Sequence, residues 1–357
     1  MRRPASRLRL MAALAVAGLG LVACGSNDTT TGAAGTPSSA AAPSAAGPQS
    51  DAKVGLAYDV GGRGDRSFND SAAAGLDRAV SEFGVTKQEL SPNASGSDRG
   101  DNLRQLAEAG FNPVFAVGFA YAETLGDVAQ DFPETTFFII DDSSLEAPNI
   151  KSLVFAEEQG SYLVGAAAAL KSESGNVGFV GGVETPLLRK FEAGFVAGAE
   201  KVKPDIETQV KYLSQPPDFS GFGSPDKGRE TARGMFDAGA DVVYAAAGGS
   251  GVGVFQAAKA QDALAIGVDS DQYESIGDES LQPVILTSMT KRVDNAVYAA
   301  MESFVAEEEI PAVTTFDLAD DGVGYATSGG FVDDIKPQLD ELAAQIEAGT
   351  IEVPTTP

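Results

Sequence analysis

The sequence predicts an α/β protein made of two lobes, each a doubly wound parallel sheet with helices on both faces. Short apolar runs alternate with segments of helical spacing along the body of the chain, from about residue 53 to 351. This alternation begins again at Asn176–Gly182, where an apolar strand leads into glycines, as it does at 53–62. Nearly continuous apolar strands are typical of parallel sheets that are buried on both faces. Two such halves predict two lobes joined by a hinge.

The first half alternates strands and helices in order. A helix is expected over 69–83 because Ala72, Leu76, Ala79 and Phe83 fall on one face. The expected strands are Lys53–Tyr58, Pro113–Val117, Thr136–Ile140 and Ile150–Phe155. The expected helices are Asn69–Phe83, Leu103–Ala109, Ala122–Phe132 and the alanine-rich Gly160–Leu170.

The second half repeats this order. The expected strands are Asn176–Gly182, Thr208–Leu213, Asp241–Ala247, Ala263–Asp269 and Val284–Ser288. The expected helices are Leu187–Val202, Lys227–Ala238, Val252–Gln261 and Arg292–Val305. We assign residues 53–154 and 289–309 to the first lobe, and residues 155–288 and 310–351 to the second. The hinge is expected where the chain crosses between lobes, near Val154–Glu157, Ser288–Thr290 and Glu309–Ala312.

The N-terminus has the features of a bacterial lipoprotein signal. Four arginines precede an apolar run, Leu10–Ala23, that is too short to span a bilayer and ends at Cys24, the only cysteine. We therefore expect a signal peptide over 1–23, cleavage before Cys24 and lipidation of its thiol. An ordinary signal peptide followed by a chance cysteine is the alternative. Residues 24–52 are rich in Gly, Ser, Thr, Ala and Pro and predict a flexible tether, and residues 352–357 a disordered tail.

Composition excludes several classes of function. The chain carries 25 basic and 51 acidic residues, a formal net charge of −26, which argues against nucleic-acid binding. It has no histidine, so Ser-His-Asp triads, Cys-His dyads and histidine metal sites are excluded. Its single cysteine excludes an intramolecular disulfide. No phosphate-binding loop of the Gly-x-x-x-x-Gly-Lys-Ser/Thr type occurs, so ATP hydrolysis would belong to another subunit.

Polar side chains follow the predicted strands at their carboxyl ends. Asp59–Asn69 follows the first strand, Asp141-Asp142 follows Ile140, and Gly248–Gly251 follows Ala247. Asp269–Asp271 and Met289–Lys291 follow two later strands. Because ligands of open α/β sheets bind beyond the carboxyl ends of the strands, we expect a site between the lobes. Carboxylates, an amide, glycines, an aromatic ring and a lysine suit a polar, hydroxylated, ring-containing small molecule.

Five segments of the chain resemble the basic membrane protein lipoproteins, also called the PnrA-like family. They are 61–69 (GGRGDRSFN), 189–195 (RKFEAGF), 247–255 (AGGSGVGVF), 266–272 (IGVDSDQ) and 286–294 (LTSMTKRVD). The resemblance covers about residues 53–335. It implies a type I periplasmic-binding-protein fold and a substrate-binding lipoprotein of an ABC importer. Members of that family bind purine and other nucleosides.

The resemblance also implies roles for single residues. Phe68 would stack on the base and Asn69 would meet its edge, although Phe68 as a core residue and Asn69 as a helix N-cap are alternatives. Phe222 would supply the second ring, with Phe219 as a rival, because the segment 216–223 is longer and richer in Pro and Gly than the family pattern. A carboxylate, Asp141 or else Asp142, would meet the base. Asp269 and Lys291, helped by Gly248, would hold the ribose.

We therefore expect a monomeric, non-enzymatic nucleoside-binding lipoprotein, without cofactor or metal, on the outer face of the cytoplasmic membrane. Its partners would be an ABC permease and an ATPase subunit. Three alternatives remain: the same fold carrying a sugar or another metabolite, a surface sensor or host-interaction lipoprotein, and an enzyme such as a nucleoside hydrolase. The sequence does not decide which nucleoside is preferred.

Overall fold

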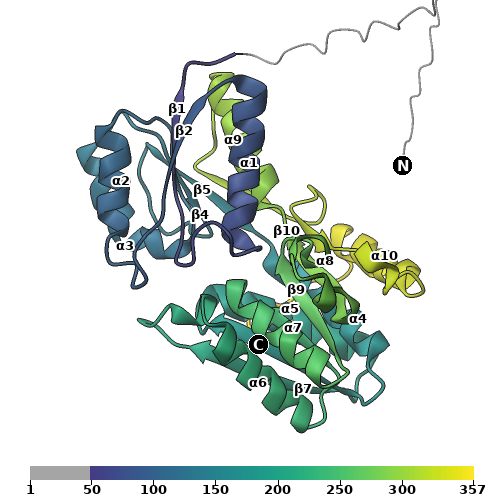
Figure 1. Ribbon diagram of the computed structural model, residues 1–357. Coiled ribbons are helices and arrows are strands. Elements are labelled where there is room, and N and C mark those ends of the chain that lie inside the picture. The colour runs from purple at the N-terminus through teal and green to yellow at the C-terminus, as the bar shows by residue number, and fades with distance from the viewer. Residues whose placement is uncertain (1–48) are drawn as a thin grey trace, which may run out of the picture. The chain divides into compact units, whose positions relative to one another are not determined.

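Two six-stranded sheets organise the chain (Figure 1). The computed structural model describes residues 49–357, which belong to one compact unit. The predicted signal peptide, Cys24 and all but the last residues of the predicted tether lie outside the described residues. Between residues 49 and 357, no helix has the length and apolar character needed to cross a membrane. The predicted α/β class with two sheets is confirmed.

The first sheet is entirely parallel and has the strand order β11-β5-β4-β3-β1-β2. Its strands are β1 (Lys53–Ala57), β2 (Thr86–Leu90), β3 (Val114–Ala116), β4 (Phe137–Ile140), β5 (Ile150–Phe155) and β11 (Val313–Phe316). Helices α1 (Phe68–Phe83) and α9 (Val293–Val305) pack against each other and share a core with one face of the sheet. Helices α2 (Arg99–Glu108) and α3 (Ala122–Asp131) share a core with the other face. We call this half the first lobe.

The second sheet has the order β12-β10-β9-β8-β6-β7 and is parallel except for the pair β10–β12. Its strands are β6 (Asn176–Val183), β7 (Glu207–Ser214), β8 (Val242–Ala246), β9 (Leu264–Asp269), β10 (Ile285–Lys291) and β12 (Val323–Tyr325). Helices α4 (Glu157–Lys171), α5 (Pro186–Val202) and α10 (Lys336–Glu347) share a core with one face, and α6 (Pro225–Asp237) and α7 (Gly251–Ala260) with the other. The short helix α8 (Gln272–Ser275) follows β9. We call this half the second lobe.

The central strands of both sheets are the ones that the apolar runs in the sequence predicted. Every residue of β3, β4, β6 and β8 is buried, as expected for strands covered by helices on both faces. Strands at the edges bury less, and this is where the prediction falls short. β2 has the sequence TKQEL with one apolar residue, and β11 and β12 are short edge strands, so none of the three was predicted. Helix α10 was also not predicted, although Leu339, Leu342 and Ile346 have helical spacing.

The crossings between the sheets correct the expected lobe boundaries. The chain first passes between them from Phe155 to Glu157, inside the predicted range, and returns after Lys291 rather than near 288–290. The third crossing lies between β11 and β12, at 317–322, not at 309–312. The prediction was wrong there because β11 pairs with β5 in the first sheet. Residues 289–291 likewise pair within the second sheet.

Helices α4 and α5 approach so closely that their backbones touch. A β-carbon on Gly198 would overlap the carbonyl oxygen of Tyr162, and one on Gly165 would overlap that of Phe195. Glycine is required at such positions because any side chain would force the helices apart. The contact matters for the site, since α4 begins at the first crossing and α5 carries residues that line the cleft described below.

We predict that Gly198→Ala lowers the free energy of unfolding by about 1–3 kcal/mol, because the added methyl group overpacks the α4–α5 interface. Gly234→Ala is the matched control: Gly234 is exposed on α6 with nothing within 4 Å of the added carbon. That variant should gain up to about 1 kcal/mol, as expected for Gly to Ala in an open helix. Urea denaturation of both variants measures the difference, and equal effects would contradict the proposed packing.

Candidate ligand-binding site

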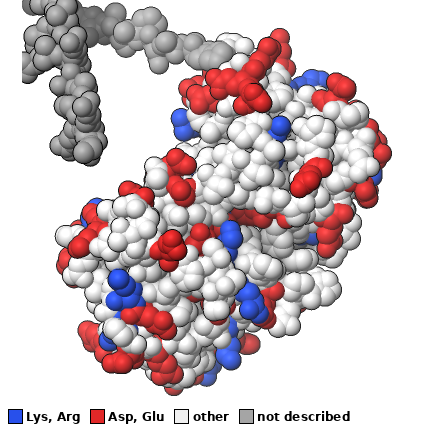
Figure 2. All heavy atoms as spheres, turned by 180° about the vertical axis from the view of Figure 1, so that it is seen from behind, with Lys and Arg blue, Asp and Glu red and all other residues white. Residues whose placement is uncertain are grey.

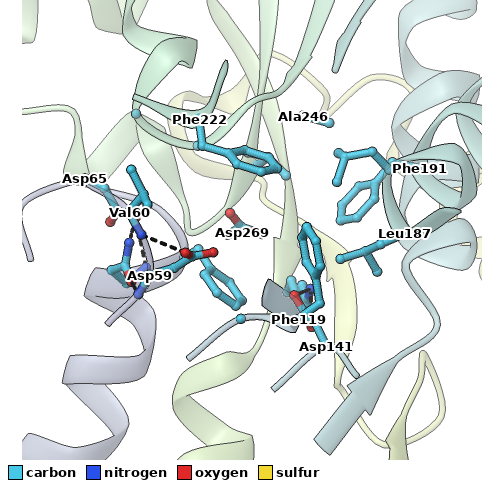
Figure 3. A pocket seen from close by; sticks show the side chains of 18 residues that line it. Asp59, Val60, Asp65, Phe119, Asp141, Leu187, Phe191, Phe222, Ala246 and Asp269 are labelled. Carbon is cyan, nitrogen blue, oxygen red and sulfur yellow. Dashed lines mark hydrogen bonds and ion pairs between the residues drawn. The ribbon is translucent and has the colours of Figure 1, made fainter. Parts of the chain in front are cut away.

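The carboxyl ends of strands from both sheets border one cleft (Figure 3). The residues that line it come from the segments that end or follow β1, β3 and β4 in the first lobe and β6 to β10 in the second. All seven residues singled out by the sequence lie in its wall: Phe68, Asn69, Asp141, Phe222, Gly248, Asp269 and Lys291. The remaining lining residues are Asp59, Val60, Asp65, Gly118, Phe119, Leu187, Leu188, Phe191, Ala246, Gly249 and Val268. The fold thus brings together side chains separated by more than 200 positions.

Four phenylalanine side chains line the cleft, two from each lobe. Phe68 begins α1 and Phe119 follows β3, whereas Phe191 lies on α5 and Phe222 follows β7. Phe68 and Phe222 are only partly buried and pack at the margin of the main core, so Phe68 serves the core and the cleft at once. Figure 3 shows the rings of Phe119 and Phe222 projecting into the cavity. Apolar ring faces from both lobes suit a flat ligand group.

The structure separates the two pairs of rival residues by position. Phe219 is not in the cleft wall; it packs edge-on against Phe119, with ring centroids 5.9 Å apart, and lies 5.5 Å from the Arg99 guanidinium carbon. Asp142 also lies outside the wall, where one of its oxygens accepts hydrogen bonds from the backbone and hydroxyl of Ser144. Geometry therefore favours Phe222 and Asp141 as the residues that face a ligand.

Lys291 is the cationic centre of the site. Its side chain is buried, and its ammonium lies 2.6 Å from Asp141 Oδ1 and 3.1 Å from Glu157 Oε1. The rings of Phe155, Phe68 and Phe191 surround it, with centroids 5.0, 5.1 and 5.6 Å away. Burial raises the pKa of Asp141 to about 7, against the opposing effect of Lys291 and with a further increase from Glu157. One ammonium thus compensates several buried carboxyl groups.

Asp269 connects the two lobes. It ends β9, and its Oδ2 accepts a hydrogen bond of 2.5 Å from the Ser67 hydroxyl of the first lobe. Burial raises the pKa of Asp269 to about 6, although Lys291 and the Ser67 hydroxyl lower it. Asp269 and Asp141 both adopt positive φ angles, 65° and 70°, which few residues other than Gly, Asn and Asp adopt readily. Strain of this kind at strand ends is common at binding sites.

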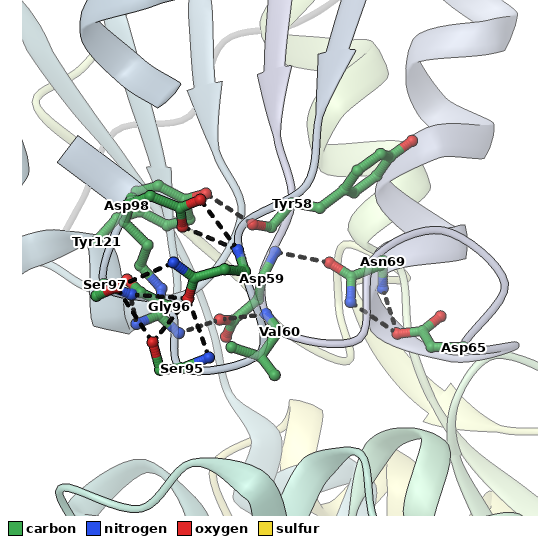
Figure 4. A network of polar contacts seen from close by, with 12 residues as sticks. Tyr58, Asp59, Val60, Asp65, Asn69, Ser95, Gly96, Ser97, Asp98 and Tyr121 are labelled. Carbon is green, nitrogen blue, oxygen red and sulfur yellow. Dashed lines mark hydrogen bonds and ion pairs between the residues drawn. The ribbon is translucent and has the colours of Figure 1, made fainter. Parts of the chain in front are cut away.

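The Asn69 side chain is held by the backbone of Asp59 and the carboxylate of Asp65 (Figure 4). Its Oδ1 accepts from the backbone N–H of Asp59 at 2.9 Å, and its Nδ2 donates to Asp65 at 3.0 Å. The N-cap of α1 is Ser67, so the alternative role of Asn69 as N-cap is wrong, and Asp65 accepts the free N–H groups of the first turn. An amide has two N–H groups and two acceptor lone pairs, so one of each remains for a ligand.

Several residues of the site were given no role from the sequence. Asp59 forms a buried ion pair of 2.7 Å with Arg99 at the start of α2, and burial raises its pKa while Arg99 opposes this. Phe119 lies three residues after the end of β3, so the position after a strand, which pointed to Asp141 and Asp269, also applied to Phe119. Phe191 and Leu187 lie on α5; Phe191 belongs to one of the five segments of the family resemblance, but neither residue was given a role in the site. Their contribution depends on which face of α5 turns toward the cleft.

The fold and this cleft define a solute-binding protein of the two-lobed ABC-transporter type. A family model described as "ABC transporter substrate-binding protein PnrA-like" matches residues 52–357, and the chain belongs to this family. The family binds substrates for ABC transporters rather than transforming them. The resemblance inferred from the five sequence segments is therefore confirmed.

Known proteins agree with this assignment. The chain is 31% identical to the ABC transporter nucleoside-binding protein BmpA of Lactococcus lactis subsp. cremoris over 325 residues, 86% of this chain and 90% of that protein. It is 36% identical to an uncharacterized lipoprotein of Pyrococcus horikoshii over 286 residues, 76% of this chain and 68% of that protein. A crystal structure of an ABC transporter solute-binding protein from Aeropyrum pernix K1 superposes with a TM-score of 0.74 at 28% identity, covering 85% and 93% of the two chains.

The buried carboxyl cluster predicts an unusual pH dependence of stability. Because the pKa of Asp141 is raised in the folded state, that group binds a proton between about pH 4 and 7 when the unfolded chain does not. Its contribution to stability is therefore favourable at low pH and is lost as pH rises toward 7. Asp141→Asn cannot ionise, so its stability relative to the native protein should improve from pH 5 to pH 8, by about 1–3 kcal/mol.

Urea denaturation at the two pH values measures this difference. Asp142→Asn removes the neighbouring carboxylate, which lies outside the cleft wall, and is the matched control. A stability difference for Asp141→Asn that stays constant across this range would contradict the proposed state of the cluster.

Proposed function

We propose that this protein binds nucleosides in the cleft and delivers them to an ABC permease. The observation that carries the proposal is the pairing of aromatic rings from opposite lobes with carboxylates at the adjoining strand ends. A nucleoside has the same two parts, a flat base and a hydroxylated ribose. The Lactococcus lactis relative is named as a nucleoside-binding protein, which supports this choice of ligand.

The base would lie between Phe68 of the first lobe and Phe222 of the second. Stacking accepts any base, because every base has a flat π-face. Discrimination would come from polar groups at its edge, for which Asn69 and Asp141 lie in the wall. Carboxylate oxygens accept hydrogen bonds only, so ionised Asp141 would favour bases that present N–H donors.

The ribose would lie against Asp269, Lys291 and Gly248. Oδ2 of Asp269 is used by Ser67, which leaves Oδ1 to accept from a ribose hydroxyl. Lys291 would donate to the same sugar. Gly248 has a φ of 53° and lies against Phe222, where a β-carbon would come within 3.2 Å of the Phe222 carbonyl oxygen. A side chain there would crowd both the loop and the ligand.

The charge of the cleft favours an uncharged ligand. Four carboxyl residues line it, namely Asp59, Asp65, Asp141 and Asp269. Among the lining residues of the described chain, Lys291 is the one basic side chain, and it is already paired with Asp141. A phosphate group would meet like charges with no cation to compensate it. Nucleosides rather than nucleotides therefore fit this site.

Binding would be coupled to closure of the lobes about the three crossings. Contacts between the lobes already flank the cleft. On one side, Asp269, Ser270 and Gln272 of the second lobe hydrogen-bond to Ser67 and Arg66 of the first. On the other, Phe219 of the second lobe packs on Phe119 and Arg99. These contacts would form when the lobes close on a ligand and part when they open.

The N-terminal features complete the proposal. Lipidation at Cys24 would anchor the protein to the outer face of the cytoplasmic membrane, and the tether would let the binding lobes reach the permease. The family assignment and the lipoprotein name of the Pyrococcus horikoshii relative support this location. On the face in Figure 2, acidic side chains form patches on both lobes with Lys and Arg interspersed among them, and no continuous basic surface for nucleic acid is visible there. The protein would act as a monomer without a cofactor and would change no covalent bond of its ligand.

We predict that base and ribose are recognised by separable residues. Phe68→Ala should weaken adenosine and adenine alike, by about 10- to 100-fold, because stacking on the base is lost from both. Asp269→Asn should weaken adenosine by at least about tenfold through the lost charge-assisted hydrogen bond, yet leave adenine nearly unchanged. Titration calorimetry provides the measurement, with Asp142→Asn as control and glucose to test for a sugar site. Full adenosine affinity in Asp269→Asn would show that the ribose is placed wrongly.

If the lobes close on the ligand, a tryptophan placed at position 219 should become shielded from solvent when adenosine binds. The chain has no tryptophan, so Phe219→Trp supplies the only one. Adding adenosine should shield this indole from acrylamide, because it packs on Phe119 and Arg99 when the lobes close. Phe331→Trp is the control, since Phe331 packs on Tyr273 within the second lobe and should not respond. Bound adenosine without any shielding at position 219 would argue against closure at this contact.

Lipid anchoring predicts a loss of membrane attachment when Cys24 is replaced. Cys24→Ser should remove both the incorporation of a labelled fatty acid and recovery in the membrane fraction, since it deletes the only thiol. Labelling of intact cells followed by fractionation tests this. Fatty-acid incorporation that persists in the variant would place the modification elsewhere.

A further inference from the structure

Glu157 is a buried carboxylate that the proposed binding scheme does not use. It is the first residue of α4, directly after the first crossing, and its side chain is 1% exposed. It does not line the cleft. Its two oxygens face two different ammonium groups: Oε1 lies 3.1 Å from Lys291 and Oε2 lies 3.2 Å from Lys190 on α5. A buried charge needs such compensation, because the interior cannot solvate it.

The position of the Lys291 ammonium depends on Glu157. Lysine has a flexible four-carbon stem, so contacts at its tip must fix it. Asp141 approaches from the first lobe, and Glu157 approaches from the start of α4, which carries the chain into the second lobe. Within the described residues, Glu157 Oε1 makes no hydrogen bond of good geometry, so the Lys291 charge is its compensation there. Removing Glu157 would leave Asp141 as the sole ion-pair partner of Lys291.

We infer that Glu157 is a positioning residue of the binding site, which fixes the Lys291 ammonium for the ligand's sugar at the point where the chain enters the second lobe. The ion pairs run from Asp141 through Lys291 and Glu157 to Lys190. This chain begins in the cleft wall and ends on α5, which itself contributes Phe191 and Leu187 to the wall. The inference rests on the proposed function, since it assigns Lys291 to a ribose.

The titratable groups around Lys291 should make ligand affinity depend on pH, which can be measured. The groups facing Asp141 and Lys291 are Asp269 from β9 and Glu157 from α4, and Lys190 from α5 faces Glu157 in turn. Farther out, Asp65 and Tyr244 face Asp269, and Glu158 follows Glu157 on α4. The negative charge of Glu157 raises the pKa of both Asp141 and Asp269. Ligand donors require these carboxyl groups ionised, so affinity should fall as pH drops through their pKa values.

The test compares Glu157→Gln with the native protein by calorimetry against adenosine and adenine between pH 5 and 8. Loss of the Glu157 charge should weaken adenosine about tenfold at pH 8 and leave adenine nearly unchanged. The pH at which adenosine affinity drops on acidification should also shift lower by about one unit, because Asp141 and Asp269 then ionise more readily. Glu157→Asp keeps the charge and should retain the native pH profile.

Glu158→Gln is the matched control, since Glu158 is also buried at the start of α4 but is not paired with Lys291. It should change neither the adenosine-to-adenine ratio nor the pH profile. If Glu157→Gln does not fold, Lys190→Gln is tested in its place. The loss of this positive charge should shift the pH at which adenosine affinity drops on acidification to a higher value. If the variants bind adenosine with the affinity and the pH profile of the native protein, the inference about Glu157 is wrong, but the proposed function stands. A native protein that binds no nucleoside would overturn the proposed function and the inference with it.

Discussion

The site depends on one constraint: a lysine ammonium buried between the two lobes must be compensated by carboxylates from both. Lys291 ends β10, immediately before the chain returns to the first lobe. Asp141 comes from the end of a first-lobe strand, and Glu157 from the start of the helix after the first crossing. Breaking such a pair is costly because it leaves an uncompensated charge in the interior. The same groups that balance Lys291 therefore also fix the geometry of the cleft.

Each lobe is rigid for reasons that do not involve the cleft. Apolar strands are buried between two helical layers in both sheets, and α4 and α5 are locked by backbone contact at glycines. The segments between the lobes are few and short by comparison, at residues 156, 292 and 317–322. Motion concentrated at such crossings moves whole strand ends relative to one another. A ligand held by residues of both lobes would then be gripped or released as a unit.

The polarity of the cleft follows from the fold and from the composition together. Parallel strands place their carboxyl ends at one edge, so any polar residue that follows a strand is directed to that edge. In this chain many of those residues are aspartates, in keeping with a net charge of −26. Burial holds the pKa of two of them, Asp141 and Asp269, well above the usual range of a carboxyl group. The resulting site accepts hydrogen bonds strongly and tolerates negative ligands poorly.

The sequence by itself determined the α/β class and the buried central strands, because hydrophobic period and apolar runs are local signals. The seven candidate residues came from the resemblance to a known family, which the positions of polar residues after strands support. It could not choose between Asp141 and Asp142, or between Phe222 and Phe219, because neighbouring residues differ only in the direction that the folded loop gives them. The edge strand β11 was assigned to the wrong lobe, since its pairing with β5 joins residues more than 150 positions apart. The role of Glu157 could be recognised only in the tertiary structure, because it depends on ion pairs with Lys190 and Lys291 that no local sequence pattern encodes.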